Sequence, residues 1–264
     1  MANRPILFST LLLITLSIPA AVSAQTGAAS YRVPSKVDLH PIVRQTFSDY
    51  FGGDGLTPPE TEGFFPIGWS RNGKFAYYVE PVDEACGCYF AELRIQDLNS
   101  DKVLWEFKND PESRTNADGS PIEDDIRRLW RRNRKLFNRK LAEYGIVPAT
   151  RFTLLGRSFS SGGRLFTANL TTRKTHNDGF GLDYIRSVKL ELSSPALGRK
   201  TLYSAENNKE SYPTLEMAVA GALKSPFENR AAVVMVYIVR GWEGPPHPVS
   251  VQIAGADLKN GFEK

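Results

Sequence analysis

The sequence is poor in the residues that build metal centres and covalent catalytic sites. It has only two cysteines and three histidines among 264 residues. Two cysteines exclude a disulfide-dense small scaffold, and three histidines leave few ligands for a zinc enzyme. No G-x-S-x-G, G-x-G-x-x-G, P-loop, H-E-x-x-H or EF-hand pattern is present. We therefore predict no metal and no cofactor, and no catalytic residue is assigned.

Long apolar runs are missing after the first 24 residues. Those residues are typical of a secretory signal peptide, with Arg4, an apolar run over 6–18 and small residues up to Ala24. The run is shorter than the roughly 20 residues that span a bilayer. We expect cleavage near Ala24, a mature chain that starts at Gln25, and a periplasmic or secreted location. No transmembrane segment is expected after signal removal.

The composition of the chain indicates a folded protein. Hydrophobic residues make up 41% and charged residues 23%, which excludes global disorder, a coiled coil and a polytopic membrane protein. We expect residues 25–62 to form a leader, a short helix at Pro41–Tyr50 and a loop. A single β-rich domain is predicted over 63–264, with a helix at 121–144 inserted into it.

Three parts of the chain show strands separated by turn residues, which predicts antiparallel β-meanders. The expected strands are 75–79, 89–98 and 103–107, then 165–170, 187–192 and 200–203, then 231–239 and 249–253. Each unit opens with Ser, then Gly or Asn, then a base, then a strand. This pattern indicates degenerate repeats, either propeller-blade-like or arranged as packed sheets. The predicted fold class is therefore α+β and β-rich, with an inserted basic amphipathic helix.

The inserted helix has clear end signals. Ser120 is the predicted N-cap, Pro121 occupies the first helical position, and Glu123 completes a capping box. Gly145 ends the helix. Apolar residues recur at spacings of three and four, at Ile126, Leu129, Trp130, Leu136, Phe137, Leu141 and Tyr144. A second, weaker helix is predicted at Thr214–Lys224 from Leu215, Met217, Ala218, Val219 and Leu223.

Positive charge is concentrated in the inserted helix. Between Ser120 and Tyr144, eight bases stand against four acids, a net of +4, whereas the mature chain without Arg4 nets +3. Such a surface attracts phosphates, anionic lipids or acidic polysaccharide. Nucleic acid is not expected, because no nucleic-acid motif accompanies the helix. The alternative is a solvated face of a helix that packs through Trp130 and Phe137. The candidate contacts to an anionic partner are Arg127, Arg128, Arg131, Arg132, Arg134 and Lys135.

A second candidate is the Cys86-Gly87-Cys88 motif, in a loop between two predicted strands. Export permits a disulfide, and a bridge between Cys86 and Cys88 would close a small strained ring around Gly87. Strained disulfides are more reducible, so the pair is a redox candidate. The alternatives are a structural pinch of the loop, two separate thiols, or a soft-metal site that lacks enough ligands for zinc.

A third candidate is the loop Gly241–Pro248, which places Trp242, Glu243 and His247 on a stiff, proline-rich turn. An aromatic ring exposed on such a turn suits stacking against a sugar or a peptide. The alternative is a structural hairpin loop with Trp242 packed against the protein.

Two stretches resemble known protein groups. Trp69–Phe75, with the sequence W-S-R-N-G-K-F, is similar to the W-S-x-D-G-R-F opening of propeller-type strands, with Asn72 in place of Asp. Asn229–Pro246, which ends in G-W-E-G-P-P, resembles bacterial predicted secreted proteins of unknown function. The resemblance implies a β-rich exported protein and supplies no catalytic residues.

Two classes of function follow from these observations. The first is an exported, non-catalytic binding or envelope-associated protein that contacts an anionic polymer or an envelope protein through the basic helix. The second is an enzyme, either a hydrolase whose carboxylates are distant in sequence or a thiol–disulfide redox protein that uses Cys86 and Cys88.

Overall fold

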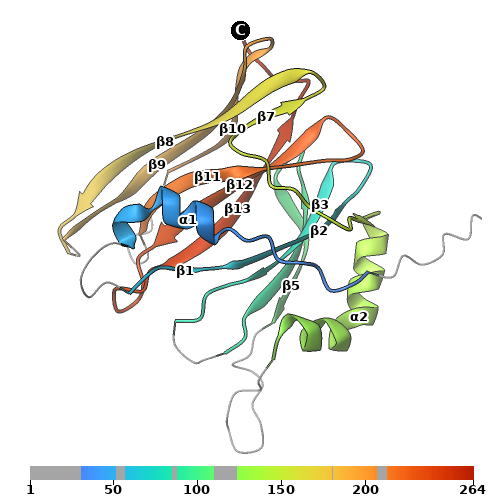
Figure 1. Ribbon diagram of the computed structural model, residues 1–264, viewed down its shortest axis with the longest axis horizontal. Coiled ribbons are helices and arrows are strands. Elements are labelled where there is room, and N and C mark those ends of the chain that lie inside the picture. Colours follow the sequence, from blue (N-terminus) through green and yellow to red (C-terminus); the bar gives the residue numbers. More distant parts are fainter. Residues whose placement is uncertain (1–30, 52–56, 85–87, 110–123, 180, 207–212) are drawn as a thin grey trace, which may run out of the picture.

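Strands dominate the computed structural model, which describes residues 31–51, 57–84, 88–109, 124–179, 181–206 and 213–264. The predicted signal peptide lies outside these ranges. Within them the strands form three sheets, accompanied by two α-helices (Figure 1). The predicted β-rich fold with antiparallel sheets is confirmed. The first helix, α1 (His40–Thr46), and a 3-10 turn at Ser48–Tyr50 lie where a short helix is predicted.

The first sheet, here called the N-terminal sheet, has the order β5-β4-β3-β2-β6. Its strands pair antiparallel, and β3, β4 and β5 form the first predicted meander. The strands are β2 (Gly63–Trp69), β3 (Lys74–Glu80), β4 (Ala91–Asp97), β5 (Lys102–Asn109) and β6 (Val147–Pro148).

The other two sheets come from the second half of the chain. The outer sheet, in the order β10-β9-β8-β7, contains the second predicted meander, and the central sheet, in the order β1-β13-β12-β11, contains the third. The outer strands are β7 (Ser158–Ser161), β8 (Arg164–Asn177), β9 (Leu182–Ser194) and β10 (Gly198–Glu206). The central strands are β1 (Glu60–Thr61), β11 (Thr214–Lys224), β12 (Arg230–Val239) and β13 (Pro248–Asp257).

The central sheet is buried on both faces (Figure 1). Side chains alternate along β12, so Val234 and Val236 pack with the N-terminal sheet while Val233 and Met235 pack with the outer sheet. This position explains why β12 is an almost unbroken apolar run.

The second helix, α2 (Ile126–Glu143), covers the opposite face of the N-terminal sheet. Its apolar residues pack with the β3 and β4 side chains that point away from the central sheet, among them Tyr78 and Leu93. The molecule is thus a stack of α2, the N-terminal sheet, the central sheet and the outer sheet, as Figure 1 shows.

The predicted helix at Thr214–Lys224 is wrong, because this segment is strand β11 and pairs antiparallel with β12. A strand buried on both faces has few polar positions, so its periodicity resembles that of a helix. A close contact also requires the strand to bend at Gly221. A Cβ there would lie 2.0 Å from the carbonyl oxygen of Leu155, which exchanges backbone hydrogen bonds with Ala222.

Helix α2 begins later than predicted. Asp125 has an extended backbone and its carboxylate accepts the N–H of Arg128 at 2.7 Å, so it is the N-cap. The predicted N-cap Ser120 lies outside the described residues. The predicted end is confirmed, because Gly145 takes a positive φ of 67° directly after the C-cap residue.

Strand β2 is missing from the sequence prediction because it contains Pro66 between two glycines, which normally interrupt strands. Pro66 is tolerated on the outer edge of the sheet, where β3 needs no hydrogen bond from it. Strands β8 and β9 likewise include 171–177 and 182–186, where a loop is predicted.

The free edge of β13 is covered by side chains of the N-terminal sheet and its connections. Strand β1 pairs with β13 only at two positions. Three polar contacts continue the edge: Val251 N–H to Glu62 Oε2 (2.6 Å), Gly255 N–H to Asp101 Oδ1 (2.7 Å), and Gln96 Nε2 to the carbonyl oxygen of Ile253 (3.1 Å). These contacts give hydrogen-bond partners to backbone groups of β13 that would otherwise be buried without one.

Gln96 is the centre of this junction and is 4% exposed. Its side-chain oxygen accepts the hydroxyl of Tyr77 at 3.0 Å, and its nitrogen also donates to Asp101 at 3.1 Å. One amide therefore joins β3, β13 and the β4–β5 turn.

We expect Gln96→Leu to lower the free energy of unfolding by about 2–4 kcal/mol, because at least two buried polar groups lose their partner. Urea denaturation at constant pH measures the change. The matched control is Gln45→Leu on the exposed side of α1, which should change stability by no more than about 0.5 kcal/mol. Equal stability of the two variants would contradict a structural role for Gln96.

Candidate functional site

The solvent-facing side of α2, here called the basic face, carries the candidate contacts to an anionic partner. All six predicted residues are exposed, and Arg139 joins them. The opposite side of the helix is buried in the N-terminal sheet through Leu129, Trp130, Phe137 and Leu141. The bases therefore stand on a helix that is fixed by its apolar side.

Two salt bridges pair bases of α2 with acidic side chains. Arg132 pairs with Asp124 before the helix, and Lys140 pairs with Glu143 at 2.9 Å. Within the described part of the chain, Arg131, Lys135 and Arg139 form no salt bridge. The middle of the basic face thus keeps its positive charge.

The basic face borders an extended segment, residues 31–37, here called the N-terminal arm. Tyr31 is buried, and its hydroxyl donates to the carbonyl oxygen of Ile146 at 2.6 Å. The indole N–H of Trp130 donates to the carbonyl oxygen of Tyr31 at 3.4 Å. Arg127 and Arg134 lie three residues before and four after Trp130, so they stand at the edge of the basic face that borders the buried side of the helix. The arm therefore runs beside the Arg127–Arg134 edge of the basic face.

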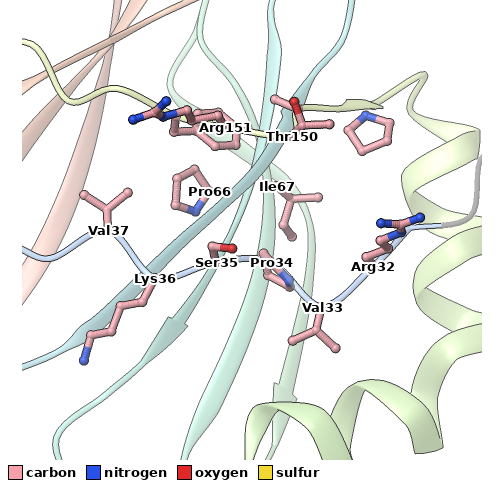
Figure 2. Close-up of a pocket in the computed structure, with 13 residues that line it drawn as sticks. Arg32, Val33, Pro34, Ser35, Lys36, Val37, Pro66, Ile67, Thr150 and Arg151 are labelled. Atoms are coloured by element: carbon pink, nitrogen blue, oxygen red, sulfur yellow. The ribbon is translucent and has the colours of Figure 1, made fainter.

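A groove of about 650 Å³ lies between the N-terminal arm, β2 and the chain that follows β6. Figure 2 shows Pro66 and Ile67 behind it, the arm across the front, and Arg32 and Arg151 on opposite sides. Lys36 extends from the arm on the side away from Arg151. None of the described residues that line the groove is acidic. The groove is therefore positively charged, like the basic face.

A second groove, of about 360 Å³, opens between the outer and central sheets. Tyr203 and Tyr237 line it together with Met217 and Glu206. Burial raises the pKa of Tyr237 above its usual value. The phenol of Tyr237 is therefore neutral near pH 7, and Glu206 is the one acidic side chain among the described residues that line this groove.

The loop Gly241–Pro248 holds Trp242 outward. The Trp242 side chain is 66% exposed, so the alternative of a packed ring is wrong. Its backbone N–H donates to Glu84 at 3.0 Å, and the N–H of Gly241 donates to Nδ1 of His247 at 3.2 Å. Burial lowers the pKa of His247, which favours the neutral imidazole that accepts this bond. Glu243 is exposed in the same turn.

Glu84, which contacts this loop, belongs to the same β3–β4 connection as Cys88. The backbone N–H of Cys88 donates to Asp83 at 2.6 Å. Cys86 lies outside the described residues, so pairing of Cys86 with Cys88 stays a prediction. The Trp242 loop therefore contacts the β3–β4 connection through Glu84, while the basic face lies on the other side of the N-terminal sheet (Figure 1).

Glu62 is the carboxyl group with the environment best suited to acid chemistry. Burial raises its pKa to about 7, although the hydrogen bond from Val251 and the charge of Arg94 act in the opposite direction. A raised carboxyl pKa is typical of general acids. Neither groove is lined by Glu62, however, and the side chain is 6% exposed. Its position at the edge of β13 identifies it as a structural group.

Glu62 makes stability depend on pH. Its pKa rises from 4.5 to about 7 on folding, so the folded state holds the proton more tightly. The stabilisation is present below pH 4.5 and is lost as pH rises through about 7.

We expect Glu62→Gln, which keeps an acceptor for Val251, to remove this dependence. The stability of the variant relative to the wild-type protein should rise by about 3 kcal/mol between pH 4.5 and pH 8. Urea denaturation of both proteins across this range tests it. A difference that stays constant with pH would contradict the assignment.

The described residues form neither a metal site nor a membrane-spanning helix. Among the described residues, no three His, Cys, Asp or Glu side chains gather as a metal site. The described helices include none with the length and hydropathy needed to cross a bilayer. The chain matches no known protein family, no curated protein and no solved structure.

The sequence predicts the basic face but not the groove beside it. Arg32 and Arg151 are more than a hundred positions apart and lie in segments without regular structure. Only the pairing of β2 with both the arm and β6 brings them to one groove. No local pattern carries that information.

Proposed function

We propose that this protein is an exported, non-catalytic binding protein whose basic face on α2 holds an anionic polymer. One observation carries the proposal: seven exposed bases share one side of a helix whose other side is fully anchored in the core. A fixed array of cations binds a repeating anion with little loss of backbone entropy.

The burial of the apolar side favours a polymer over a lipid surface. Membrane-surface helices insert their apolar side below the headgroups. In α2 that side is occupied by the N-terminal sheet. The available interaction is therefore electrostatic, and arginine forks suit phosphate and carboxylate groups.

The proposed location is the periplasm or the exterior of the cell, after cleavage near Ala24. The apolar run over 6–18 and the small residues that follow it support this location. The expected partner is then an anionic polymer or protein of the cell envelope. We also propose that the three meanders are degenerate repeats, since each sheet contains one.

We expect Arg127→Gln/Arg131→Gln/Arg134→Gln to lose affinity for a phosphate-rich polyanion without a change in fold. Column retention across a salt gradient and fluorescence titrations with long-chain polyphosphate measure it. The slope of log affinity against log salt should fall by about 2–3, close to one unit for each lost phosphate contact.

The matched control is Lys102→Gln/Arg164→Gln/Lys259→Gln, which removes the same charge from exposed positions outside α2. Circular dichroism checks the fold of both variants. The proposal fails when the wild-type protein and the α2 variant elute together at low salt.

A further inference from the structure

We infer that the groove beside the N-terminal arm continues the basic face, and that the ligand is a linear phosphate-bearing chain lying along both. This inference rests on the proposed function, because it extends the same binding surface and names the chemistry of its ligand.

The arm makes the two surfaces continuous. Tyr31 is fixed under Trp130 of α2, and Arg32 follows it directly. Figure 2 shows Arg32 at the end of the groove nearest α2 and Arg151 toward the opposite end. A chain that leaves the Arg127–Arg134 edge of the helix therefore reaches Arg32 next and Arg151 after it.

The charges along this path are of one sign. Arg32 and Arg151 are exposed, and within the described part of the chain neither pairs with a carboxylate. None of the described residues that line the groove is acidic. An anionic chain is attracted at every point of the path, whereas a peptide of mixed charge is not.

The outer edge of β2 is poorly suited to bind a peptide as an additional strand. On this edge, the carbonyl oxygen of Phe64 accepts the N–H of Val37 (2.8 Å). The carbonyl oxygen of Ile67 accepts the N–H of Ala149 (3.0 Å). Between these bonds lies Pro66, which has no N–H to donate. A peptide cannot pair along this edge in the usual way. The groove therefore offers side-chain charges and not a backbone ladder.

The shape and the donor set favour a phosphate chain. A groove of about 650 Å³ accepts a thin linear chain and excludes a folded partner. Arg127 to Arg134 cover about 10 Å of helix, so helix and groove together span many phosphate units. Arginine donates two parallel bonds to a phosphate group.

The test uses the mature chain with Arg32→Gln/Arg151→Gln, and Lys102→Gln/Arg164→Gln as the charge-matched control. Long-chain polyphosphate, tripolyphosphate and polygalacturonate are titrated at several salt concentrations. We expect the groove variant to bind long-chain polyphosphate about tenfold more weakly than the control, with a salt slope lower by about 1.5. Tripolyphosphate is too short to contact both surfaces, so the wild-type protein should prefer the long chain strongly.

The possible results separate the two proposals. A groove variant that binds like the control, while the α2 variant is weakened, overturns this inference and leaves the proposed function standing. Tighter binding of polygalacturonate than of polyphosphate at equal charge overturns the phosphate assignment. Failure of the wild-type protein to bind any of the three probes overturns the proposed function itself.

Discussion

The fold depends on how the free edge of β13 is satisfied. Its backbone groups are bonded by side chains of Glu62, Gln96 and Asp101 where a neighbouring strand would normally lie. Apolar contacts alone allow one sheet to slide over another, because they are not directional. Hydrogen bonds to defined backbone atoms fix one position. The junction therefore sets how the N-terminal sheet lies on the central sheet, and it does so with a carboxyl group whose burial opposes its ionisation.

The position of the N-terminal sheet in turn decides where the candidate site forms. With one face against the central sheet, its other face is left for α2, and its outer edge at β2 is left for the arm and β6. Pro66 stops either segment from pairing along the whole edge. The groove lies where pairing along this edge is interrupted, and Pro66 is one of the residues that line it.

Local patterns in the sequence predict the elements whose apolar residues recur at a regular spacing. The meander β3–β5, the hairpin β12–β13 and the buried side of α2 all belong to this group. Strand β11 does not, since burial on both faces hides its period of two. Strand β2 contains residues that usually end strands, and its pairing partners are supplied from distant parts of the chain. The same distance hides the groove, because Arg32 and Arg151 meet only through tertiary structure.

The two sides of α2 make opposite contributions to its stability. Four like-charged pairs at a spacing of four residues, 127–131, 128–132, 131–135 and 135–139, each cost about 0.2–0.5 kcal/mol. Burial of its four core side chains contributes about 6–12 kcal/mol. The fold therefore tolerates the repulsion but gains nothing from it. An anionic chain bound as proposed would relieve this repulsion and release its own counterions, and would thereby stabilise the helix.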